Sequence, residues 1–187
     1  MTQTLHRRTF MLGATLAAAG LAAPSLVRAD DAGVDANISS FRAKAWKDYF
    51  PSLRHGAILA DTQSRAVHFW SEDEATYLLF PCSVPGSPDL TRTGMTEVVE
   101  KVVGPTWRPT PSMRQRMPWL PAVVGPGPDN PLGPFALYLS WQYYRVHGTQ
   151  DTRKIGRKSS DGCIGLYNED ITDLFKRAKV GTQVHII

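Results

Sequence analysis

Short apolar runs separated by turn residues limit what this chain can fold into. Its 187 residues include 15 glycines and 14 prolines, which interrupt helices and long strands. Residues 57–60, 66–70 and 76–84 are rich in β-branched, aromatic and other apolar residues, with short polar turns between them. This spacing is typical of antiparallel hairpins. The sequence therefore predicts a mainly β fold.

The same reasoning extends to the rest of the chain. Further strands are predicted at 135–139, 142–146 and 182–187. Apolar residues at helical spacing predict short helices at 38–50 and 170–179. Residues 104–134 contain most of the prolines. We expect a long ordered loop there, because few regular elements continue through so many prolines.

The first 29 residues resemble a twin-arginine signal peptide. Arg7 and Arg8 precede an uncharged apolar run, Gly13 to Leu21, and Val27 and Ala29 fit the positions that a signal peptidase reads. The run is shorter than the roughly 20 residues that span a bilayer. We expect cleavage after Ala29, with an uncleaved anchor as the alternative. Either outcome places the domain outside the cytoplasm, in the periplasm.

Charge and motif content exclude several functions. The formal net charge is +4, but Arg7, Arg8 and Arg28 belong to the leader, so the body is close to neutral. No block of basic and aromatic residues indicates nucleic-acid binding. No cysteine and histidine cluster has zinc spacing. We therefore expect no metal, no cofactor and no nucleic-acid partner.

His147 and Cys163 are the candidate chemical groups. A thiol attacks a carbonyl carbon as thiolate, which requires a nearby base. A strand that ends at His147 and a turn that leads into Cys163 could bring the two side chains together. Gly162 permits a tight turn, and its amide, with that of Cys163, could bind the developing oxyanion. The arrangement predicts nucleophilic acyl transfer.

These residues belong to an ordered set of motifs. GPDNPLG at 127–133, HGT at 147–149, SSDGC at 159–163 and VGTQV at 180–184 follow one another along the chain. The set resembles the catalytic domain of L,D-transpeptidases, the YkuD domain, over residues 55–187. Residues 1–29 would then be the signal peptide and residues 30–54 a short lead-in.

The resemblance implies a fold and an activity. The expected fold is a β-sandwich or partly open barrel of mixed strands with one or two short helices. The expected activity is cysteine acyl transfer on peptidoglycan stem peptides, which either cross-links stems or attaches a protein, such as an outer-membrane protein. In the family the carbonyl after the histidine, here that of Gly148, orients the imidazole. Candidate substrate-binding residues are Ser160, Asp161, Asn168 and Asn130.

Several of these positions have a structural reading as well. Ser160 either supports the oxyanion turn or donates a local hydrogen bond, and Asn168 could support its loop. Residues 127–133 are expected to form a turn that lines the cleft. Trp107 is expected in the core or the cleft wall.

Cys82 differs from Cys163 in its surroundings. It lies in a predicted strand, where a buried core residue is expected, and a disulfide between Cys82 and Cys163 is the alternative. His55, His68 and His185 are expected to be strand or surface residues.

Two positions depart from the family pattern. Asp161 stands where histidine is often found, and Gly165 stands where arginine is usual. An anion is thus gained and a cation lost near Cys163, so we expect Asp161 to raise the pKa of the thiol. Arg157 and Lys158 are candidates to compensate. These departures favour a substrate group that is neutral or carries an amine.

Two further functions remain open. The same scaffold could act as a thiol hydrolase, with water as the acyl acceptor. It could also be a catalytically inert peptidoglycan-binding module, for which Asp161 and Gly165 are the support.

Overall fold

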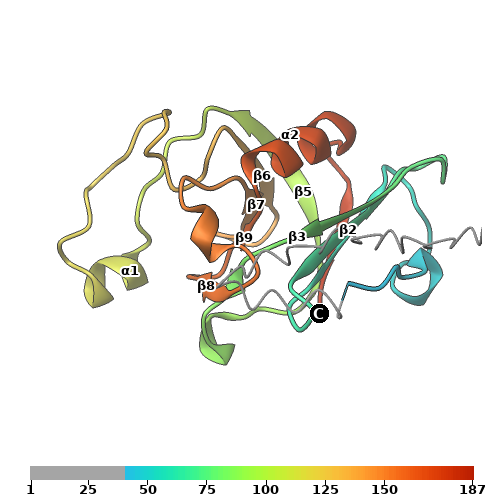
Figure 1. Ribbon diagram of the computed structural model, residues 1–187, viewed down its shortest axis with the longest axis horizontal. Coiled ribbons are helices and arrows are strands. Elements are labelled where there is room, and N and C mark those ends of the chain that lie inside the picture. The colour runs from blue at the N-terminus through green and yellow to red at the C-terminus, as the bar shows by residue number, and fades with distance from the viewer. Residues whose placement is uncertain (1–40) are drawn as a thin grey trace, which may run out of the picture. The chain divides into compact units, whose positions relative to one another are not determined.

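The computed structural model describes residues 41–187 (Figure 1). The predicted signal peptide at 1–29 and the first part of the lead-in lie outside the described residues. Within residues 41–187, no helix is long and apolar enough to cross a membrane.

The described part of the chain is mainly β, as predicted. Its strands are β1 (Ala57–Asp61), β2 (Ala66–Trp70), β3 (Tyr77–Pro81), β4 (Val84–Pro85), β5 (Gly94–Val103), β6 (Phe135–Leu139), β7 (Arg145–His147), β8 (Lys158–Ser160), β9 (Ile164–Gly165) and β10 (Gln183–Ile186). Its helices are α1 (Pro111–Arg116) and α2 (Asn168–Arg177), with 3-10 turns η2 (Trp46–Asp48), η3 (Pro88–Leu90) and η4 (Thr152–Lys154).

Eight of these strands form one mixed sheet in the order β3-β2-β1-β10-β5-β6-β7-β9, and β4 pairs with β8 separately. The predicted hairpins are confirmed, because β1 pairs antiparallel with β2 and β2 pairs antiparallel with β3. The last strand, β10, lies between β1 and β5 and runs parallel to β1. It therefore joins the N-terminal hairpins to β5, β6, β7 and β9.

Alternation along the strands gives the sheet two buried faces. In β1, Ile58 and Ala60 belong to the larger core cluster, while Ala57 and Leu59 belong to a smaller one. Ile171 and Leu174 of α2 pack in the larger cluster. The smaller cluster is completed by aromatic and aliphatic side chains of the lead-in, among them Phe50 and Leu53.

Some predicted elements are wrong. In the described part of the expected helix at 38–50, only the 3-10 turn η2 is present. Its neighbours Tyr49 and Phe50 pack on the sheet, and so short a segment has little helical stability of its own. The strand expected at 142–146 is instead β7, because Tyr143 has a φ of 68° and lies in a turn.

The segment 104–134, hereafter the proline-rich segment, contains a helix that we did not expect. Thr110 caps α1 by accepting a hydrogen bond from the Met113 amide at 3.2 Å, and Pro111 occupies the first turn. Proline is tolerated there because the first helical amides have no partner within the helix. The strand β5 was also missed. Its apolar and charged residues come in pairs and do not alternate, and only part of the strand is buried.

Cys82 is fully buried in the larger core cluster, as predicted, and both cysteines are free. Burial raises the pKa of the Cys82 thiol far above its ordinary value. The alternative of a disulfide between Cys82 and Cys163 is therefore wrong.

We expect Cys82→Ala to lower the free energy of unfolding by about 1 kcal/mol, because it leaves a small void in a packed core. Urea unfolding measures this change. Alkylation of Cys163 in the folded variant should match that of the parent chain. An unchanged stability, or loss of Cys163 alkylation, would contradict the assignment of Cys82 to the core.

Candidate active site

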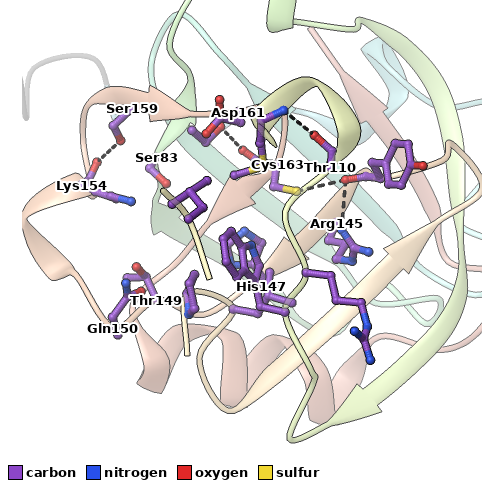
Figure 2. A pocket seen from close by; sticks show the side chains of 18 of the residues that line it. Ser83, Thr110, Arg145, His147, Thr149, Gln150, Lys154, Ser159, Asp161 and Cys163 are labelled. Carbon is purple, nitrogen blue, oxygen red and sulfur yellow. Dashed lines mark hydrogen bonds between the residues drawn. The ribbon is translucent and has the colours of Figure 1, made fainter. Parts of the chain in front are cut away.

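A cleft of about 280 Å³ lies between the C-terminal half of the sheet and the proline-rich segment. The sheet side contributes His147 at the end of β7 and Cys163 just before β9 (Figure 2). The proline-rich segment contributes a mostly apolar wall: Trp107, Met113, Met117, Leu120, Pro131 and Leu132. The expectations that Trp107 belongs to the cleft wall and that 127–133 borders the cleft are confirmed.

Strand register brings the two candidate groups together. The strands β7 and β9 run parallel, with Val146 opposite Ile164 and His147 opposite Gly165. Their apolar residues Val146 and Ile164 are buried in the core and anchor the pair. Cys163 precedes Gly165 by two residues, so His147 lies beside the segment that presents the thiol.

The ring of His147 has a defined orientation. Its Nδ1 lies in hydrogen-bond contact with the carbonyl oxygen of Gly148. A carbonyl only accepts, so Nδ1 carries the proton and Nε2 is the accepting nitrogen. Burial lowers the pKa of His147 to about 4, against the raising effect of the Gly148 carbonyl. At neutral pH the imidazole is thus uncharged and able to accept a proton.

The thiol of Cys163 is also uncharged in the resting structure. Its Sγ donates to the carbonyl oxygen of Tyr143 at 3.3 Å. Burial raises the pKa of Cys163, Arg145 lowers it, and Asp161 raises it with the smallest effect. The expected direction for Asp161 is confirmed, but burial is the larger cause.

Ser160 closes the turn that presents the thiol. Its hydroxyl donates to the Cys163 carbonyl oxygen at 2.5 Å and accepts from the Gly162 amide at 3.4 Å. Gly162 has a φ of 125°, a backbone conformation that residues other than glycine rarely adopt. The local hydrogen bond expected for Ser160 is present, and Ser160 also borders the cleft.

Asp161 is not an unpaired anion. It forms an ion pair with Arg116 of α1, so the proline-rich segment and the nucleophile turn are linked at the cleft edge. The cations that line the cleft are Arg108, Arg145 and Lys154. The cleft therefore contains cations although position 165 supplies none, and its lining includes neither Arg157 nor Lys158.

The two asparagines hold backbone instead of lining the cleft. Asn130 is fully buried; its Nδ2 donates to Pro105 and Gly125 carbonyls at 2.6 and 2.8 Å, and its Oδ1 accepts from the Leu132 amide. Asn168 accepts from the Thr149 amide at 2.9 Å. The loop support expected for Asn168 is present, and the polar atoms of both side chains bond to neighbouring loops.

Gly165 is required by close packing. It exchanges backbone hydrogen bonds with Ser83 at 2.8 and 3.1 Å. A Cβ at position 165 would overlap the Ser83 hydroxyl oxygen. An arginine therefore cannot occupy this position unless Ser83 moves. Ser83 fills the space that a side chain at position 165 would need.

Arg145 is the cleft residue that sequence reasoning missed. It is opposite Tyr138 and His147 is opposite Ala136 in the pairing of β6 with β7. Residues two apart in a strand face the same side. Because Arg145 lies two residues before His147 in a predicted strand, the sequence already indicated that both side chains face the cleft. Within residues 41–187, no group of three metal-binding side chains is present.

We expect the alkylation rate of Cys163 to keep rising with pH beyond the ordinary thiol range, because burial raises its pKa and disfavours the thiolate. Iodoacetamide kinetics followed by mass spectrometry, in a Cys82→Ala background, measure this profile. A plateau of fast alkylation at about pH 5–7 would indicate a preformed thiolate–imidazolium pair and contradict the neutral resting state.

We expect Asn130→Ala to cost about 2 kcal/mol in unfolding free energy, because it leaves buried carbonyls and an amide without partners. Limited proteolysis should then cut first within the proline-rich segment. Asp129→Ala, at the exposed neighbouring position, is the matched control and should change neither. Equal proteolysis of both variants would show that Asn130 does not hold this segment.

The chain is similar in sequence to known proteins. Residues 55–186 match the family model for the YkuD L,D-transpeptidase catalytic domain. A putative L,D-transpeptidase of Fuscovulum blasticum is 55% identical over 191 residues, covering 100% of both chains. The probable L,D-transpeptidase ErfK/SrfK of Escherichia coli is 38% identical over 141 residues, covering 73% of this chain and 45% of the relative. The chain thus spans less than half the length of that relative.

Solved structures share the fold. An L,D-transpeptidase from Mycobacterium smegmatis superposes with a TM-score of 0.53 at 18% identity, covering 71% of this chain and 58% of that one. One from Mycobacterium tuberculosis gives a TM-score of 0.52 at 15% identity, covering 71% and 57%. The mixed-strand architecture expected from the sequence is confirmed.

Proposed function

This chain belongs to the family of L,D-transpeptidase catalytic domains, and from that premise we propose that it is an exported cysteine acyl-transferase acting on peptidoglycan stem peptides in cell-wall biogenesis. The observation that carries the proposal is the cleft in which Cys163 and His147 lie together, with the imidazole uncharged and its Nδ1 fixed by Gly148.

The first half-reaction forms an acyl-enzyme. Nε2 of His147 accepts the thiol proton as Cys163 Sγ attacks the carbonyl carbon that joins an L-centre to a terminal D-residue. The carbon–nitrogen bond breaks, the imidazolium returns the proton to the leaving amine, and a thioester remains. Because the thiol starts neutral, proton transfer accompanies attack.

The second half-reaction transfers the acyl group. An amine attacks the thioester carbon and His147 accepts a proton from that amine. The carbon–sulfur bond then breaks, and the imidazolium returns the proton to the sulfur, which restores the thiol. The acceptor is an amine on a second stem or on a protein, such as an outer-membrane protein. Water in the same position would give hydrolysis.

The turn around Cys163 suits oxyanion binding. Gly162 and Cys163 contribute backbone amides next to the sulfur, and the Gly162 amide makes only a long contact of 3.4 Å with Ser160. A developing oxyanion is a stronger acceptor than a hydroxyl, so that amide is available for it. Ser160 and Asp161 then act mainly by shaping this turn.

Export follows from the leader at 1–29, which we propose to be a twin-arginine signal that delivers the domain to the periplasm, where stem peptides are found. Residues 30–54 would form the lead-in and 55–187 the catalytic domain. Fractionation of cells that produce the full chain, with Arg7 and Arg8 replaced by lysine as the control, tests this step.

The activity is tested by incubating the protein with a tetrapeptide stem and an amine acceptor. Intact-protein mass spectrometry detects the acyl-enzyme, and product analysis separates the outcomes. Cross-linked stems or protein conjugates support transfer, and shortened stems alone support the hydrolase. Binding without any covalent adduct would support the inert module and contradict our proposal.

We expect Cys163→Ala to abolish acyl-enzyme formation and His147→Gln to slow it by roughly 10²–10⁴, the usual contribution of a general base. Cys82→Ala is the matched cysteine control and should keep turnover. The thermal unfolding midpoint of each variant shows whether it is folded. Turnover near the parent rate in folded Cys163→Ala would refute this mechanism.

A further inference from the structure

Arg145 is a cation at the reacting end of the cleft. Its Nη1 donates to the Tyr143 carbonyl oxygen at 3.2 Å, and Cys163 Sγ donates to the same oxygen at 3.3 Å (Figure 2). The guanidinium therefore lies within two hydrogen-bond lengths of the sulfur. Stacking on Tyr138, with the guanidinium carbon 4.4 Å from the ring centre, fixes its position.

No carboxylate of residues 41–187 forms an ion pair with Arg145. The carboxylate of the cleft lining, Asp161, is paired with Arg116. The Nε of Arg145 is buried and has no hydrogen-bond partner within the described residues. A partly buried guanidinium is costly without an anion, so its place in an open cleft fits a carboxylate that arrives with a ligand.

The location defines which carboxylate this is. When Cys163 attacks the carbonyl before a terminal D-residue, the carboxylate of that residue is separated from the scissile nitrogen by a single Cα. A guanidinium this near to the sulfur can therefore reach it, and its planar donors match a carboxylate with paired hydrogen bonds. Gly165, packed on Ser83, leaves β9 without a side chain to do so.

We propose that Arg145 binds the terminal carboxylate of the leaving D-residue and makes the enzyme selective for acyl donors that end in a free acid. This inference rests on the proposed function and adds to it a specificity residue and a class of donor. It replaces the expectation, drawn from Asp161 and Gly165 alone, that the site favours a neutral or amine-bearing group.

The test uses two tetrapeptide donors that are identical except for a C-terminal acid or amide. The rate constant for acyl-enzyme formation is measured with the full chain. The parent protein should prefer the acid by about tenfold or more, the effect of a charge-assisted hydrogen bond of about 1.4 kcal/mol. In Arg145→Met, which keeps an apolar stem over Tyr138, the ratio should fall to within about twofold of unity.

Arg108→Met removes another cation of the same cleft and is the matched control; its acid-to-amide ratio should equal that of the parent. An undiminished ratio in folded Arg145→Met, a parent ratio near unity, or a ratio lost in Arg108→Met instead would each overturn the assignment. If Arg145→Met does not fold, Arg145→Gln, which is polar but uncharged, decides. A reduced ratio in that variant supports the proposal, and a parental ratio overturns it.

The two proposals fail in different ways. If the parent protein acylates neither donor, the proposed function is wrong and the role of Arg145 falls with it. If it acylates both donors equally, the function stands and only the role of Arg145 is wrong.

Discussion

The parallel pairing of β7 with β9 is the constraint on which the site depends. It places His147 beside Gly165 and hence near Cys163, and buried Val146 and Ile164 hold the register from the core side. A slip by one residue would turn His147 toward the core and Val146 into the cleft. The strands contain three and two residues, so their register relies on the neighbours, above all Ser83 bonded to Gly165 and β6 paired with β7.

Charge in the cleft is arranged by pairing. Asp161 is held by Arg116 of α1, so its negative charge is compensated at the rim and has the smallest effect on the Cys163 pKa. Arg145 has no such partner among residues 41–187. Asp161 and Arg145 therefore differ in role. Asp161 joins the proline-rich segment to the nucleophile turn, whereas Arg145 is the cleft cation that we propose to bind a carboxylate of the ligand.

Sequence reasoning succeeded where a signal was local. The strands at 57–60, 66–70 and 135–139 follow from apolar runs between turns, and α2 follows from helical spacing of Ile171, Leu174 and Phe175. The burial of Cys82 followed from its place in an apolar run. The ordered motifs around His147 and Cys163 identified the family because several spacings had to agree at once.

Two of the failures share a physical cause, since each depended on a partner distant in sequence. Asp161 was judged without Arg116, 45 positions away, and Gly165 without Ser83, 82 positions away. The bonds of Asn130 could not be predicted either, because its amide donates to carbonyls that only the folded proline-rich segment brings together. α1 was missed for a local reason, because the prolines of this segment were treated as helix breakers although Pro111 lies at the helix start.

Cys163 and His147 are both uncharged at rest, so the cations of the cleft do not act mainly by activating the thiol. If Arg145 served mainly to stabilise a thiolate, its charge would have to outweigh the burial of Cys163, whereas burial is the larger effect. An imidazole whose pKa is about 4 likewise keeps no permanent positive charge beside the sulfur. The positive charge of Arg145 thus suits binding of an anionic substrate better than stabilisation of a thiolate at rest. Binding that anion would hold the scissile carbonyl near Cys163 while His147 remains free to accept the thiol proton, so that substrate position, more than thiol acidity, determines when the sulfur reacts.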